Sequence, residues 1–205
     1  TSQRLLAPDA GFARQVLPGV RTEMQTQING VDGWSVRTVD SAGATVATLT
    51  EKAPVSGSTV TLGADSAVAA QITDTGRRIT LLSGEAFFEV ARDTSRPFVV
   101  TAGGVDVTAL GTAFNVQLSE AAATIELARG SVGVDWEQAP GRDAAVLAPG
   151  EMVVVDRRTG EMVRSTIAQD DIAAWRGGKL FVNAATIGSV VEQLQRYHTA
   201  WIKVP

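Results

Sequence analysis

Few side chains in this sequence could carry out acid–base, nucleophilic or metal chemistry. There is no cysteine, which excludes disulfides, thiolate catalysis and cysteine-based zinc sites. The single histidine, His198, excludes a metal site built from several histidines. Glu85 and Glu89 fall on one face of a predicted strand, but hydrolysis by paired carboxylates needs a cleft that the sequence does not indicate. We therefore expect no metal ion, no cofactor and no catalytic centre of these kinds.

The elements around these residues belong to a globular chain. Its 205 residues are 44% hydrophobic and 20% charged, a composition typical of folded proteins. The net charge is −4 and no run of lysine or arginine occurs, so we expect no binding to nucleic acid. No apolar stretch reaches the roughly 18 residues that a membrane helix needs. We expect any membrane anchor or export signal to lie outside this sequence.

From about Trp34 to Val155 the sequence predicts short β-strands separated by turns. Residues 34–39, 58–62 and 105–110 alternate apolar with polar residues or are rich in β-branched residues, as half-buried strands require. Glycines punctuate the strands, and no helical period of useful length interrupts them. The pattern predicts a mainly β protein, either two-sheet or solenoid-like, although no strict repeat is present.

The two ends of the chain differ from this β region. Residues 2–17 could form a weak amphipathic helix, which Pro8 and Gly11 disfavour, and we treat residues 1–33 as a segment of unclear structure. Residues 34–168 form the predicted β domain. Residues 169–205 predict a β-α-β unit, with strands at 179–182 and 201–204 around a helix at 186–198. The apolar stripe of this helix is expected to be core.

Several motifs in order resemble the FecR family of anti-sigma regulators. The central one is Leu82-Ser-Gly-Glu-Ala-Phe-Phe-Glu-Val-Ala91, in which we expect Phe87 and Phe88 to be mainly core residues on opposite faces of a strand. It is followed by Val107-Thr-Ala-Leu-Gly-Thr-Ala-Phe-Asn-Val116, Ile125-Glu-Leu-Ala-Arg-Gly-Ser-Val132 and Trp175-Arg-Gly-Gly-Lys-Leu-Phe181. The similarity runs from about residue 44 to residue 204.

This resemblance implies a function in signalling. FecR-family proteins are anchored in the inner membrane, and a cytoplasmic segment, absent here, binds an ECF sigma factor. Their periplasmic region senses the signalling domain of a TonB-dependent outer-membrane transporter, usually one for a siderophore. The resemblance therefore implies that this chain is a periplasmic, non-enzymatic sensor of iron uptake. Its predicted β-α-β tail resembles the first half of a secretin/TonB short N-terminal module.

The family resemblance also draws attention to Gly111 and Thr112. Some family members break their own backbone at this dipeptide through an N–O acyl shift, in which the threonine hydroxyl attacks the preceding carbonyl. A glycine on the carbonyl side tolerates a strained backbone. The simpler interpretation is that Gly111 makes a turn and Thr112 begins a strand.

Partner binding is expected at the strand edges of the tail, because an unpaired edge can accept a strand from another chain. A periplasmic carbohydrate-binding β module is a further alternative, although the aromatic residues are scattered rather than grouped. The residues predicted to contact the transporter's signalling domain are Lys179, Leu180, Phe181, Val182, Trp201, Ile202, Lys203 and Val204.

Overall fold

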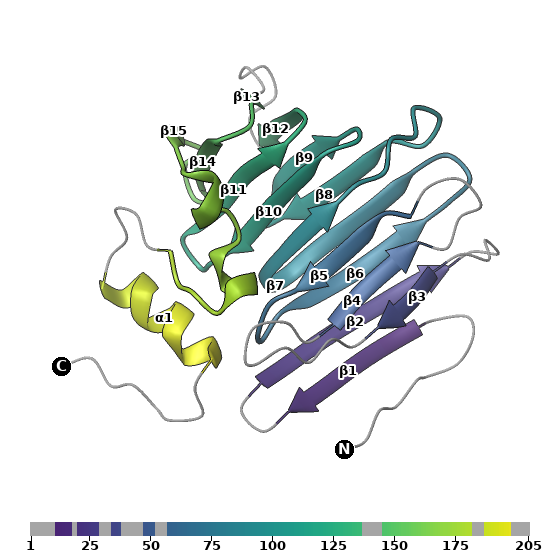
Figure 1. Cartoon of the computed structure of the whole chain (residues 1–205), viewed down its shortest axis with the longest axis horizontal. Helices are drawn as coiled ribbons and strands as arrows, with labels where there is room; N and C mark the ends of the chain where they lie inside the picture. The colour runs from purple at the N-terminus through teal and green to yellow at the C-terminus, as the bar shows by residue number, and fades with distance from the viewer. Residues whose placement is uncertain are drawn as a thin grey trace.

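The protein, seen here as a computed structural model, consists mainly of strands in the residues that the structure describes, with one α-helix among them near the C-terminal end (Figure 1). The structure describes residues 11–17, 20–28, 34–37, 47–51, 57–136, 145–181 and 187–197. The elements are β1 (Gly11–Leu17), β2 (Val20–Ile28), β3 (Trp34–Arg37), β4 (Ala47–Glu51), β5 (Thr59–Leu62), β6 (Ala67–Ile72), β7 (Arg77–Glu89), β8 (Phe98–Ala102), β9 (Val105–Ala109), β10 (Ala113–Leu118), β11 (Ala122–Arg129), β12 (Val132–Trp136), β13 (Ala145–Leu147), β14 (Glu151–Asp156), β15 (Met162–Thr166) and α1 (Ile187–Tyr197).

The strands form one continuous hydrogen-bonded system with two halves, which we call sheet A and sheet B. Sheet A has the order β1-β2-β6-β7-β8-β9-β12-β13. Sheet B has the order β3-β4-β5-β7-β10-β11-β14-β15. From β8 onward the chain adds hairpins alternately, β8–β9 and β12–β13 to sheet A, β10–β11 and β14–β15 to sheet B. This alternation confirms the predicted mainly β fold and gives it a solenoid-like winding.

Strand β7 belongs to both sheets. Its first half pairs with β6 and β8 in sheet A, and its second half pairs with β5 and β10 in sheet B. The change of sheet occurs at Gly84, whose φ of +81° is a conformation that side chains disfavour. A Cβ atom there would lie 2.6 Å from the Cα atom of Ser66. The hydroxyl of Ser66 accepts a hydrogen bond from the Glu85 amide at 2.9 Å, which holds the bend from the other side.

The main core lies between the two sheets. The side chain of Phe88 in sheet B stacks on Phe114 at a centroid distance of 5.0 Å and meets Phe98 of sheet A edge-on at 6.1 Å. All three rings are fully buried, together with aliphatic side chains from β5 through β14. Burial of this kind stabilises a fold by roughly 25 cal/mol for each Å² of apolar surface removed from water.

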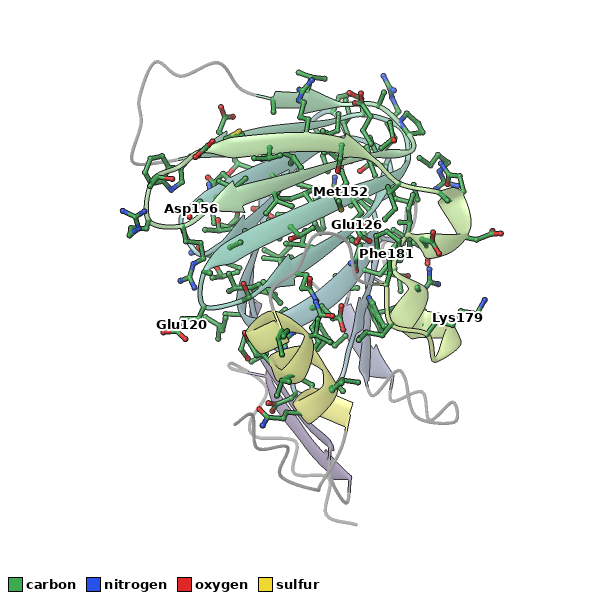
Figure 2. All side chains as sticks on the ribbon, turned by 90° about the vertical axis from the view of Figure 1, so that its left-hand side faces the viewer. Glu120, Glu126, Met152, Asp156, Lys179 and Phe181 are labelled. Carbon is green, nitrogen blue, oxygen red and sulfur yellow. The ribbon has the colours of Figure 1, made fainter. Side chains whose placement is uncertain are left out.

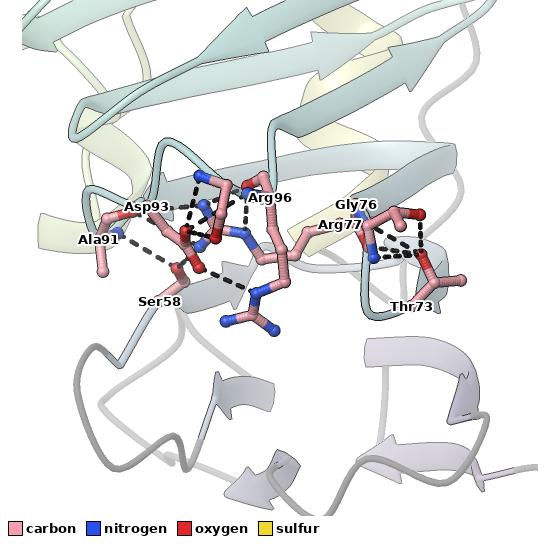
Figure 3. Close-up of polar contacts among 9 residues, drawn as sticks. Ser58, Thr73, Gly76, Arg77, Ala91, Asp93 and Arg96 are labelled. Carbon is pink, nitrogen blue, oxygen red and sulfur yellow. Dashed lines mark hydrogen bonds and ion pairs between the residues drawn. The ribbon is translucent and has the colours of Figure 1, made fainter.

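A buried arginine fixes the start of β7 (Figure 3). The Arg77 side chain is 1% exposed and donates hydrogen bonds to the Arg96 carbonyl at 2.9 Å, to the Ser58 hydroxyl at 3.0 Å and to the Ala91 carbonyl at 3.4 Å. Its guanidinium also lies 5.3 Å from the centroid of the Phe98 ring. These contacts tie β7 to the connection between β7 and β8, because a buried guanidinium requires acceptors for its donors.

The ends of the chain correct two sequence predictions. The helix expected over residues 2–17 is wrong where it can be compared, because Gly11–Leu17 is a strand that pairs with β2. The β partner overrides the weak helical pattern, which Gly11 already interrupts. The expected strand at residues 179–182 is absent over Lys179–Phe181, which follow a 3-10 turn. Val182 and the expected strand at 201–204 lie outside the described residues.

The predicted C-terminal helix is confirmed as α1, but its apolar stripe is not core. Ile187 is 74% exposed, and Val190, Val191 and Leu194 are only half-buried. The helix lies beside one end of the β domain and covers it only in part (Figure 1). Within the described residues, no helix is long and apolar enough to cross a membrane.

Replacing Gly84 with alanine tests the bend in β7. Gly84→Ala is expected to lower the free energy of unfolding by about 2–4 kcal/mol, because the new Cβ atom meets Ser66 and the positive φ is strained. Gly76→Ala is the matched control: nothing lies within 4 Å of a Cβ atom there, and its effect should stay within about 0.5 kcal/mol. Urea unfolding of both variants measures the two changes in the free energy of unfolding. Equal stabilities would contradict the requirement for glycine at the bend in β7.

Candidate functional site

The segment after β15 folds back over the outer face of sheet B. We call residues 167–181 the strap; it contains two 3-10 turns, Gln169–Asp171 and Ala174–Gly177. Its buried side chains Ile167, Ile172 and Trp175 pack on Phe87, Ala113 and Met152 of sheet B, in a hydrophobic cluster separate from the main core. Figure 2 shows Met152 and Phe181 near one another on this side of the sheet. The strap therefore buries the part of β7 around Phe87 that points away from the core.

A buried polar network lies under the strap. The Trp175 Nε1–H donates to Asn115 Oδ1 at 3.1 Å, and Asn115 Nδ2 donates to Glu126 Oε2 at 3.2 Å. The same Glu126 oxygen accepts the backbone amide of Ala173 at 3.0 Å. Ala173 adopts a left-handed conformation with φ of 50°. The network thus connects two strands of sheet B to the point at which the strap turns.

Glu126 has an unusual environment for a carboxyl group. Burial raises the pKa of Glu126 to about 7, and the nearby charge of Glu85 acts in the same direction. The hydrogen bonds from Ala173 and Asn115 oppose the shift, since both favour the ionised form. At neutral pH the Glu126 carboxyl is therefore close to the midpoint between its protonated and ionised forms.

The end of the strap leads from this network to α1. The guanidinium of Arg176 lies 4.1 Å from the centroid of the Phe87 ring, a cation–π geometry. The amide of Lys179 donates to the Ala174 carbonyl at 3.1 Å, which closes the last turn. Beyond it, Lys179 and Leu180 are exposed, whereas Phe181 is half-buried against the second cluster.

Gly111 and Thr112 form the connection from β9 in sheet A to β10 in sheet B. Gly111 has a φ of +72°, and Thr112 is fully buried. The Thr112 carbonyl accepts the Val90 amide at 2.7 Å, but its hydroxyl has no hydrogen-bond partner among the described residues. The dipeptide packs against Gly130, where a Cβ atom would lie 2.8 Å from Thr112 Cγ2. The simpler interpretation, a turn followed by a strand, describes this geometry, and self-cleavage stays a prediction.

Comparison with known proteins identifies the β region. The model of the FecR protein family matches residues 36–133, which run from β3 into β12 and include the bend in β7 and the Gly111–Thr112 connection. This region of the chain is therefore similar to the FecR protein family. Its strap and α1 lie outside the matched residues.

Solved structures extend the likeness beyond the FecR match. Two crystal structures, each of a proposed anti-sigma factor from Parabacteroides distasonis ATCC 8503, are similar to this chain. The first is 26% identical, with 82% of this chain and 72% of that chain covered and a TM-score of 0.57. The second is 25% identical, with coverages of 80% and 75% and a TM-score of 0.58. No curated protein matches the sequence. These likenesses support a regulator of the anti-sigma type.

The structure describes some of the residues predicted to bind a partner protein. Lys179, Leu180 and Phe181 form the end of the strap, while Val182, Trp201, Ile202, Lys203, Val204 and His198 lie outside the described residues. Glu85 is buried beside the network, whereas Glu89 is exposed. Phe87 and Phe88 face opposite sides of β7 as predicted, but both are buried because the strap covers the outer side.

Sequence reasoning missed the network itself. Asn115 and Glu126 are direct partners in the register of β10 and β11, so two polar residues at paired positions were the available signal. That signal needs the strand register, and the third member, Trp175, comes from a segment 60 positions away along the chain from Asn115.

The raised pKa of Glu126 predicts that acid stabilises the closed strap. Glu126 holds its proton up to about pH 7 in the folded chain and only to about 4.5 in the unfolded chain, so the contribution of Glu126 to stability is greatest below pH 4.5, falls as the pH rises and levels off above pH 7. Between pH 5 and pH 8 the loss should be about 2–3 kcal/mol. Urea unfolding across this range measures it. Glu126→Gln should remove this pH dependence and exposed Glu89→Gln should keep it; identical profiles for all three proteins would contradict the assignment.

Proposed function

We propose that this chain is the periplasmic sensor region of a membrane-anchored anti-sigma regulator. It relays a siderophore-uptake signal from a TonB-dependent outer-membrane transporter to an ECF sigma factor, which is held by a cytoplasmic segment outside this sequence. The observation that carries the proposal is the likeness to two proposed anti-sigma factors over about four-fifths of the chain.

The arrangement of the strap supports transmission by protein contact. The strap leads along the chain from sheet B toward α1. Its position depends on apolar packing against sheet B and on the hydrogen bonds of Trp175 and Ala173 to Asn115 and Glu126. A partner that holds residues 179–181 or α1 therefore acts on the Glu126 network through a short segment. Exposed Lys179 and Leu180 are the described residues that such a partner would reach.

The carbohydrate-binding alternative finds little support. A sugar site usually presents an exposed aromatic platform, yet no Phe or Trp is among the large exposed hydrophobic side chains of the described residues. The three phenylalanine rings of the core and Trp175 are buried.

Self-cleavage at Gly111–Thr112 is the second candidate, and the buried hydroxyl of Thr112 is the observation that favours it. The Thr112 hydroxyl oxygen would attack the Gly111 carbonyl carbon, and the peptide C–N bond would break as the hydroxyl proton passes to the new amine of Thr112. Water would then hydrolyse the resulting ester. An unpartnered hydroxyl is costly to bury, which is consistent with retention for a chemical purpose. The fragments would end at Gly111 and begin at Thr112.

Calorimetric titration with the signalling domain of a TonB-dependent transporter encoded beside this protein tests the relay. Saturable one-to-one binding is expected. Leu180→Asp should weaken it at least about tenfold, because a charge would replace an exposed apolar contact. Val146→Asp, at an apolar residue in β13 that is 59% exposed against 37% for Leu180, is the control and should leave the affinity unchanged. Failure of the folded wild-type chain to bind would contradict the proposed partner.

Mass spectrometry of the chain under denaturing conditions tests cleavage. The wild type should yield a fragment that ends at Gly111, and Thr112→Ser should yield the same fragment because it keeps a hydroxyl. Thr112→Val should remain whole and be equally or more stable, because the valine keeps the packing against Gly130 without a hydroxyl to satisfy. Cleavage of the valine variant at this bond would rule out the acyl shift.

A further inference from the structure

A cavity of about 350 Å³ separates α1 from one end of the β domain. Its walls come from the bulged part of β7 near Leu82, the β10–β11 turn at Ser119 and Glu120, Arg157 after β14, and Glu192 and Arg196 of α1. Figure 2 shows Glu120 beside α1. The volume is in the range of small-ligand sites. This cavity is separate from the strap network, since none of its lining residues belongs to that network.

Two arginines that line this cavity each have one buried nitrogen without an acceptor among the described residues. Arg196 is 8% exposed; its Nη2 donates to the Leu118 carbonyl and to Glu192 Oε1, both at 3.1 Å, but its Nη1 has no partner among the described residues. Arg157 uses Nη1 to donate to the carbonyls of Ser119 at 2.7 Å and Glu120 at 2.9 Å, while its buried Nε has no partner there. Unmet guanidinium donors are best satisfied by a carboxylate.

Acidic side chains line the same cavity nearer to solvent. Asp65 and Glu120 are exposed, and Glu192 is partly exposed while it pairs with Arg196. They would repel a simple anion, yet they would attract a positive group placed beside it. The exposed Leu82 adds an apolar surface at the rim. The cavity therefore complements a ligand with a carboxylate for the arginines and an ammonium group for the acids.

We propose that this cavity binds a zwitterionic group, a carboxylate adjacent to a protonated amine. Arg157 and Arg196 hold the carboxylate, and Asp65, Glu120 and Glu192 hold the amine. Two sources share this chemistry: a free α-amino acid, or neighbouring acidic and basic side chains of a bound peptide. Binding contacts α1 and the β domain at once, so it fixes their relative position.

The test uses the whole chain labelled with ¹⁵N-arginine, and follows the Nε–H signal of Arg157 by NMR. The probes are L-leucine, the blocked peptide acetyl-Ala-Asp-Lys-Ala-amide, and the half-ligands acetate and methylamine, all at constant ionic strength. L-leucine or the peptide should give a saturable shift, half-complete at a concentration at least about tenfold below that of acetate. The better of the two probes identifies the source. Shifts that never saturate, or equal affinity for acetate, would overturn the proposal.

Matched variants locate the site. Arg157→Gln should raise the half-saturating concentration at least about tenfold, and binding to this variant is followed on the remaining arginine signals. Arg158→Gln removes the same charge from the next residue, which is exposed, and should leave the half-saturating concentration unchanged. Glu120→Gln changes an exposed side chain, so the fold should persist, and it should reduce the preference over acetate. Equal loss in the Arg157 and Arg158 variants would show a general charge effect and would contradict the site.

Discussion

The fold depends on one strand that is shared by two sheets. Because β7 pairs on both sides in sheet A and again on both sides in sheet B, every later hairpin extends a sheet that β7 began. Gly84 permits the change of sheet, and the buried guanidinium of Arg77 fixes the beginning of the strand. A single core between the sheets follows from this connection, since both walls of the core share one backbone.

The strap adds a second, weaker layer to this rigid domain. Its apolar side chains bury the outer face of sheet B, but its orientation rests on a network centred on one carboxyl group. Removing a carboxylate from water is costly, so the network favours a proton on Glu126. A charged group in this position stabilises less than an apolar one would, and it makes the contact responsive to changes that leave the main core unaffected.

Local sequence patterns predicted the elements whose environment is local. The strands within residues 34–155 and the helix α1 followed from the periods of strands and helices, and both were confirmed in the described residues, although the apolar stripe of α1 is not core. Gly11–Leu17, in the segment treated as of unclear structure, was not predicted as a strand because this strand depends on pairing with β2. The network could not be predicted, because Asn115 and Glu126 meet only through register and Trp175 reaches them only through the strap. The cavity likewise needs the placement of α1 against turns distant in sequence.

The features with potential function lie along one strand. β10 begins directly after the Gly111–Thr112 bond, carries Ala113 and Asn115 under the strap, and ends at Leu118, whose carbonyl binds Arg196 of α1. At about 3.3 Å per residue, roughly 20 Å separates the bond from the cavity. Because β10 is paired with β7 and β11 on both sides, it cannot slip by one residue without turning its core side chains outward. A force on α1 or on the strap is therefore carried by β10 as a rigid element, and a cut at Gly111–Thr112 would free its first end while both neighbouring strands still hold it.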